Sequence, residues 1–296
     1  MGIDYYTSKV LHEIRQNFKD KKSILLLGNQ NLCVPPQYLN DFFDEKYNIK
    51  TIRNKFYQNT FAKPFLEELG FDQVHSLEFE EKDNADLILN LNTKIKDLNK
   101  KYDIVLNGGT LEHVFNIPVA LENIFLLLKK SGFFVSISPT NNLCNHGFYQ
   151  FSPDLFISLD YFNENLDLKK LYIIENHHEL QKKSKIYECN YQNIDKSNTL
   201  NAYKSSNPTE ILTIIQKKEE FILNENLIQL AYINNKKNNT TTSNNKKVKK
   251  IPELFKYIFQ VHLKSTIFFF INLFKKNNFK NDYYIKRKTV SLIKDH

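Results

Sequence analysis

The chain has 296 residues, a formal net charge of +8 and three cysteines, Cys33, Cys144 and Cys189. This length can bury a full core, so one α/β domain with an appendage is expected. The cysteines are too few and too scattered for a disulfide framework, which indicates a reducing compartment. No secretory leader is visible, and the longest dense apolar run, 266–274, is about half the roughly 20 residues that a membrane-spanning helix needs. We therefore expect a cytoplasmic protein.

The positive charge is concentrated in the last quarter of the chain, whereas the first two hundred residues mix both signs. Residues 234–250 are polar and of low complexity, which predicts a flexible linker after a main domain over 1–233. Residues 251–296 form a basic, aromatic, amphipathic segment, of which 251–274 has helical character. It suits a membrane surface, self-association or docking on its own domain. Nucleic acid is not an expected partner, because no RNA-binding motif accompanies it.

The first ninety residues contain one expected helix and three expected strands. The helix has its apolar residues on one side, and each strand is a short apolar run. These elements cover residues 8–18, 23–27, 74–77 and 87–89. The strands end at Gly28, Glu78 and Asn90, at the sheet edge where open α/β sheets bind ligands.

Residues 102–154 contain the most informative pattern. A buried strand at 104–106 leads through an Asn-Gly-Gly turn into an amphipathic helix, for which Gly132 is the expected terminator. A second strand over 133–138 ends at a proline, which cannot donate to a ladder. Strand, helix and strand with short connections imply a right-handed crossover and a parallel pair.

Further strands are expected at 171–174 and 211–215, with a polar insertion or long loop over 180–206. Strands that alternate with helices at this spacing indicate a doubly wound sheet.

Each polar strand end has a functional and a structural interpretation. Gly28 allows a ligand to approach the backbone, but it also suits an ordinary turn. Glu78 is placed to accept hydrogen bonds from ribose hydroxyls, or it is a solvated acid beside Glu80 and Glu81. Asn90 offers an amide for an adenine edge, or it is a turn residue.

The turn after the strand at 104–106 is followed by Thr110, a candidate helix cap, and by Glu112 and His113. The helix dipole favours Glu112 there with or without a function. His113 is a candidate proton acceptor or a structural histidine.

The loop over 141–153 places His146 and Tyr149 among amides and aromatic residues. His146 is a candidate general base, because its pKa is ordinarily near neutrality; the alternative is a loop held by its own side chains. Cys144, His146 and His113 lack a fourth ligand of suitable spacing, so no metal site is expected. The sequence also contains no P-loop and no Gly-x-Ser-x-Gly elbow.

Taken together, the strand ends resemble those of class I S-adenosylmethionine-dependent methyltransferases over residues 20–220. The segment YDIVLNGGTLEHVFNIPVALENIFLLLKKSGFFVSISP is similar to the family's fourth strand, following helix and fifth strand, with Lys-Ser-Gly where Lys-Pro-Gly-Gly is usual. The stretch NHGFYQFSPDLF resembles a bacterial subgroup, often of unassigned substrate. The resemblance implies a Rossmann-like α/β fold with a doubly wound, seven-stranded sheet, followed here by the basic C-terminal extension.

The resemblance also implies roles for matched residues. Those on the methionine side of the cofactor would be Leu27, Gly28, Asn29, Asn107, Gly108 and Gly109, with Glu112 and His113 close by. Glu78 would bind the ribose hydroxyls, and Asn90 with Leu91 would flank the adenine. The family's first loop is normally rich in glycine, whereas Gln30 and Leu32 stand here where further glycines would be.

The implied activity is transfer of a methyl group from S-adenosylmethionine to a small molecule or a sugar or surface-glycan precursor. His146 would act as base or orient the acceptor, with Tyr149 secondary. Two alternatives stay open: a methyltransferase-like scaffold without turnover, favoured by the glycine-poor first loop, and an RNA methyltransferase recruited by the tail.

Overall fold

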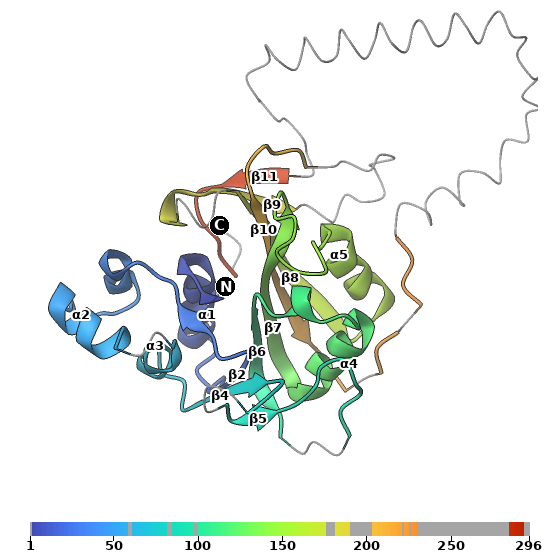
Figure 1. Ribbon diagram of the computed structural model, residues 1–296, viewed down its shortest axis with the longest axis horizontal. Coiled ribbons are helices and arrows are strands. Elements are labelled where there is room, and N and C mark those ends of the chain that lie inside the picture. The colour runs from blue at the N-terminus through green and yellow to red at the C-terminus, as the bar shows by residue number, and fades with distance from the viewer. Residues whose placement is uncertain are drawn as a thin grey trace, which may run out of the picture.

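The structure is a computed structural model in which α-helices cover both faces of one large mixed β-sheet (Figure 1). It describes residues 2–58, 61–81, 85–96, 100–175, 181–189, 203–220, 222–224, 226–229 and 284–292. The expected linker over 234–250, residues 251–283 of the C-terminal segment and the pair His177 and His178 lie outside the described residues.

In the described part of the chain the main sheet has nine strands, in the order β11-β9-β8-β10-β7-β6-β2-β4-β5. These strands are β2 (Ser23–Leu27), β4 (Gln73–Glu78), β5 (Leu87–Ile88), β6 (Tyr102–Gly108), β7 (Leu128–Asn141), β8 (Leu166–Glu175), β9 (Lys185–Cys189), β10 (Thr209–Lys217) and β11 (Tyr284–Arg287). The five from β5 to β7 are parallel, whereas β10 is antiparallel to both β7 and β8.

The expected count of seven strands was too low. One additional strand, β9, lies inside the stretch that was predicted to be a polar insertion or loop, and the other, β11, pairs with it from the C-terminal segment. The sequence gives no clear signal for the pairing of β9 with β11, because both strands are short and largely polar and they lie far apart in the chain.

Alternating side chains of the central strands form two cores, one on each face of the sheet. Ile24 and Leu26 of β2 belong to one core, and Leu25 and Leu27 belong to the other. The first core is covered by α1 (Tyr5–Asn17), α2 (Ile49–Phe56) and α3 (Lys63–Glu68), and the second by α4 (Ile117–Leu127) and α5 (Pro153–Phe162). Figure 1 shows these two groups of helices on opposite sides of the sheet.

Shorter elements complete the described fold. A separate parallel pair joins β1 (Gly2–Ile3) to β3 (Asn31–Leu32). Three short 3-10 helices are η1 (Pro36–Asp41), η2 (Leu111–His113) and η3 (Gln181–Lys183). No helix in the described ranges is both long enough and apolar enough to cross a membrane.

The boundary between α4 and β7 differs from the expected one. The helix ends at Leu127 and the strand begins at the next residue, so Gly132 lies inside β7 and does not terminate the helix. Ser131 has a φ of 59°, and the register between β6 and β7 shifts nearby, which accommodates the early start of the strand. The strand also continues past Pro139 to Asn141, with Pro139 opposite Glu210 of β10.

The described part of the C-terminal segment belongs to the main domain. Val290 is fully buried. The Tyr172 hydroxyl donates to the carbonyl oxygen of Ser291 at 2.6 Å, and the backbone N–H of Leu292 donates to Glu13 Oε2 at 2.6 Å. Residues 284–292 therefore comprise the strand β11 and a docked stretch, and the helical character expected over 251–274 falls outside the described residues.

Candidate functional site

The strands β2 and β6 are neighbours in the sheet, and the order in which the chain adds parallel strands reverses direction between them. From β2 the sheet continues to β4 and β5, and from β6 it continues to β7 on the other side. Such a switch point leaves a crevice at the carboxyl ends of the strands, which is where open α/β sheets bind ligands. The predicted residues of the first and second strand ends and of the Asn-Gly-Gly turn all lie at this edge.

The turn after β2 is closed by a carboxylate from β4. Gly28 has a φ of 81°, a conformation that favours glycine. Its N–H donates to the carbonyl oxygen of Leu77 at 2.7 Å, and the N–H of Asn29 donates to Glu78 Oε1 at 2.6 Å. Among the described residues, Glu78 Oε2 has no hydrogen-bond partner. The structure thus brings Gly28, Asn29 and Glu78 together at one edge of the sheet.

Gln30 is a residue of this edge that the sequence analysis noted only as a missing glycine. Its side chain is buried, and its Nε2 donates to the carbonyl oxygen of Leu27. A Cβ added at Gly108 would lie 2.5 Å from Gln30 Oε1, so the side chain of Gln30 lies against the backbone of Gly108. The glycine-poor loop was the signal that could have identified it.

Asn107 is fully buried, and the described structure uses its side chain for internal hydrogen bonds. Its Nδ2 donates to Ser136 Oγ and Ser138 Oγ, both at 2.9 Å. Its Oδ1 accepts the N–H groups of Thr110 and Leu111 at 2.9 and 3.0 Å. The side chain therefore holds the turn after β6 in place, and a ligand would meet the adjacent glycines instead.

Thr110 does not cap the following helix with its side chain, contrary to the expectation. Its hydroxyl donates to the carbonyl oxygen of Leu27 at 2.5 Å, which joins the turns after β2 and β6. Gly109 in the same turn has a φ of 95°. The two glycine-containing turns are thereby fixed side by side at the switch point.

The third strand end forms a local turn. Asn90 Oδ1 accepts the backbone N–H of Asn92 at 2.9 Å, and Asn92 Oδ1 accepts the N–H of Asn116 at 2.9 Å. Leu91 is buried between them. The Asn90 side chain therefore acts as a turn residue in this structure. The hydrogen bond from Asn116 to Asn92 connects this turn to the start of α4.

Glu112 has an unusual environment for a carboxylate. Its side chain has 0% exposure, and neither carboxylate oxygen has a hydrogen-bond partner among the described residues. Burial raises the pKa of Glu112 to about 7, and the charge of Glu210 acts in the same direction. Such a group is costly to bury in its charged form unless a cation or a donor accompanies it.

The loop after β7 is attached to the backbone of Glu112. The carbonyl oxygen of Glu112 accepts the N–H of Phe148 at 2.7 Å and that of Tyr149 at 3.3 Å. A Cβ added at Gly147 would lie 2.7 Å from this carbonyl oxygen, so only glycine fits there. The contact fixes His146, one residue earlier, beside the Glu112 side chain.

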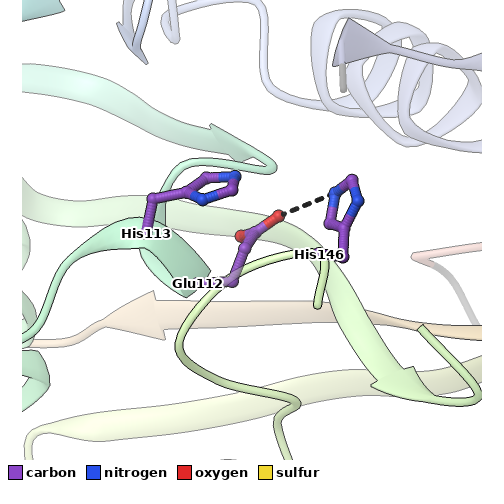
Figure 2. A group of neighbouring side chains, drawn as sticks. All are labelled: Glu112, His113 and His146. Atoms are coloured by element: carbon purple, nitrogen blue, oxygen red, sulfur yellow. Dashed lines mark ion pairs between the residues drawn. The ribbon is translucent and has the colours of Figure 1, made fainter. Parts of the chain in front are cut away.

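Three of the predicted site residues form one group. Glu112, His113 and His146 each offer a nitrogen or oxygen atom, and these atoms all lie within 4.8 Å of one another. His146 Nε2 lies 3.8 Å from Glu112 Oε1, and Figure 2 shows the carboxylate between the two imidazole rings. Partial desolvation of the ring, followed by the charge of His146, lowers the pKa of His113.

Tyr149 and Cys144, the two other candidates in this loop, have different surroundings. Tyr149 donates its hydroxyl to the carbonyl oxygen of Phe115 at 2.7 Å, which anchors the loop. Cys144, considered from the sequence as a metal ligand with the two histidines, is exposed and does not belong to the group. Glu112 takes the place that the sequence analysis gave to the cysteine.

No protein-family model and no curated protein matches the chain. Similar solved structures include a putative methyltransferase from Bacillus halodurans, at 10% identity and a TM-score of 0.35, over 71% of this chain and 99% of that one. Another is a putative S-adenosylmethionine-dependent methyltransferase from Listeria monocytogenes, at 13% identity and a TM-score of 0.36, over 70% of this chain and 97% of that one. A third is a possible histamine N-methyltransferase from Thermotoga maritima, at 12% identity and a TM-score of 0.34, over 72% of this chain and 90% of that one. Likenesses at this level assign neither a family nor a reaction to this chain.

Proposed function

We propose that the chain is an S-adenosylmethionine-dependent methyltransferase. The observation that carries the proposal is the arrangement at the switch point, where the Gly28 turn is closed by the carboxylate of Glu78. An acidic residue at the end of the neighbouring strand is the group that binds ribose hydroxyls in nucleotide-binding sheets. The resemblance of residues 102–154 to the methyltransferase family selects this cofactor among nucleotides.

The residues at this edge fit such a cofactor in their chemistry. One oxygen of Glu78 holds the Asn29 N–H, and the other has no partner in the described ranges. Gly28 and Gly109 are partly exposed and present backbone without a side chain, which allows close approach of a ligand, whereas Gly108 is buried. The side chain of Gln30 lies against Gly108 and would have to move for a ligand to reach that backbone.

The acceptor is proposed to be a small molecule or a sugar or surface-glycan precursor that enters beside His146. When bound, S-adenosylmethionine supplies a methyl group on a sulfonium sulfur for in-line transfer to an acceptor atom. The chain mainly orients the acceptor and excludes water. His146, with 36% of its side chain exposed, is the residue proposed to orient the acceptor or to take its proton. Tyr149 holds the loop through Phe115.

Calorimetry of the full chain with S-adenosylmethionine and S-adenosylhomocysteine tests the proposal. We expect one saturable site for each compound. If neither compound binds to the folded protein, the enzyme proposal is contradicted. The alternative of a methyltransferase-like scaffold without turnover would then remain. Methyl transfer is then measured by incubation with labelled cofactor and a panel of hydroxylated and amine-bearing sugars.

A further inference from the structure

The group formed by Glu112, His113 and His146 has a composition that neither cofactor binding nor loop structure explains. It combines two imidazoles and one carboxylate from two separate segments, η2 and the loop after β7. Its central group, Glu112, is completely buried, and its two oxygens lack hydrogen bonds within the described residues. The pair Glu112 Oε1 and His146 Nε2, at 3.8 Å, is too far apart for a hydrogen bond.

We propose that Glu112, His113 and His146 bind a divalent transition-metal ion. Two nitrogen ligands and one oxygen ligand suit zinc, manganese or iron, and three protein ligands are typical of sites that keep an open position for substrate or water. Magnesium and calcium prefer all-oxygen sites, so two imidazoles disfavour them. A cation between these residues would also compensate the buried carboxylate.

The separations of the ligand atoms are compatible with this proposal. Metal–ligand bonds of about 2.1 Å at tetrahedral angles place two ligand atoms about 3.4 Å apart. Glu112 and His146 are already near this separation, at 3.8 Å, and the whole group lies within 4.8 Å. His113 is exposed, so its imidazole can rotate inward. Figure 2 shows the two rings on either side of the carboxylate.

The surrounding backbone holds two of the three ligands before any ion binds. The hydrogen bonds from Phe148 and Tyr149 to the Glu112 carbonyl oxygen fix the loop to η2, and Gly147 permits the close contact. The loop therefore brings His146 to Glu112 without help from a metal. Such preorganisation lowers the entropic cost of assembling the site.

One consequence rests on the proposed methyl transfer. A metal-bound His146 has its ligating nitrogen occupied, so it would orient the acceptor through the ion and would not take a proton. An acceptor with an oxygen or nitrogen donor could then occupy the open position. Metal binding itself does not depend on this consequence.

Calorimetry of the full chain, stripped with a chelator and titrated with Zn²⁺ or Mn²⁺ alone, tests the proposal. We expect one ion per chain at this site. Glu112→Gln, His113→Ala and His146→Ala should each weaken binding by more than about tenfold, since even outer partners of metal ligands contribute about 10- to 100-fold. Titration with Co²⁺ should give a visible absorption band in the parent chain that these variants lose.

Two variants serve as controls. Cys144→Ser removes a nearby exposed thiol, and His12→Ala removes a histidine of α1 far from the group in sequence; both should bind the ion like the parent. Circular dichroism checks folding, and if Glu112→Gln unfolds, the two histidine variants decide alone. Absence of saturable binding of both ions, or unchanged affinity in His113→Ala and His146→Ala, would overturn the proposal. Binding of S-adenosylmethionine without metal, measured separately, reports on the proposed function instead.

Discussion

Glu78 Oε1 accepts the backbone N–H of Asn29 at 2.6 Å, and this hydrogen bond joins the ends of β4 and β2. The carboxylate therefore has a structural partner on one oxygen, and the proposed cofactor would bind the other. Its exposure is intermediate, so a ligand can reach it without unfolding of the edge.

Glu78→Gln should weaken binding of S-adenosylmethionine by about tenfold or more, because hydrogen bonds to a charged group contribute roughly 1.5–3 kcal/mol. The amide oxygen can still accept the Asn29 N–H, so the fold should persist. Calorimetry measures the affinity. Glu81→Gln, which changes an exposed acid three residues later, is the matched control and should bind like the parent. Equal affinities for the two variants would show that Glu78 does not contact the cofactor.

Gln30 gives a second prediction at the same edge. Its side chain lies against Gly108, and its Oε1 has no hydrogen-bond partner among the described residues. Gln30→Ala removes this obstruction, so affinity for S-adenosylmethionine should rise. The variant also loses the hydrogen bonds to Leu27 and Thr110, so the free energy of unfolding should fall by about 1 kcal/mol.

Calorimetry and urea unfolding separate the two effects of Gln30→Ala. Gln16→Ala in α1 is the control, because Gln16 is exposed and distant in sequence. A weaker affinity in Gln30→Ala would mean that the glutamine side chain contacts the cofactor and does not obstruct it.

The hydrogen bonds and the ion pair of Asp103 should make the free energy of unfolding depend on pH. Its Oδ2 accepts the N–H and the hydroxyl of Ser23 at 2.9 and 2.7 Å, and Lys129 Nζ lies 3.1 Å away. Burial alone would raise the pKa of Asp103, but the hydrogen bonds from Ser23 and the charge of Lys129 outweigh it and lower the pKa. A carboxyl whose pKa is lower in the folded state contributes stability above its unfolded pKa of about 3.9 and loses it as the pH falls through the folded pKa.

Asp103→Asn should therefore lower the free energy of unfolding at pH 7 by about 1–3 kcal/mol, with a smaller difference in acid, below about pH 4. Urea unfolding at several pH values measures this difference. The control is Asp72→Asn, since Asp72 pairs with Lys22 in an exposed ion pair. A difference between Asp103→Asn and the parent that stays constant from pH 7 to pH 3 would contradict the linkage.

The part of the site that the sequence could predict is the part set by strand ends. Gly28 and Glu78 follow apolar runs that form parallel strands, and the carboxyl ends of parallel strands share one edge, so their proximity follows from the pattern. The group of Glu112, His113 and His146 was only partly predictable. All three were candidates, but the burial of Glu112 depends on how the loop after β7 folds over η2, which no periodicity encodes.

Two further features lay beyond sequence reasoning for similar reasons. Asn107 directs its side chain to Ser136 and Ser138 of β7, an interaction that requires the register of β6 against β7. The pairing of β9 with β11 joins segments about a hundred residues apart, and closing such a loop depends on tertiary contacts. Local patterns identify elements, whereas these contacts depend on their three-dimensional arrangement.

The docked C-terminal stretch provides the last prediction. Val290 is fully buried in the core on the side of α1, and the neighbouring Ser291 and Leu292 are hydrogen-bonded to Tyr172 and Glu13. Val290→Ala should therefore lower the free energy of unfolding by about 1–3 kcal/mol, because it removes buried methyl groups and leaves a cavity. Lys288→Ala, an exposed position two residues earlier, should change it by less than about 0.5 kcal/mol. If urea unfolding finds the two variants equally stable, residues 284–292 do not belong to the folded core; a selective loss in Val290→Ala would make this end of the chain a structural part of the domain.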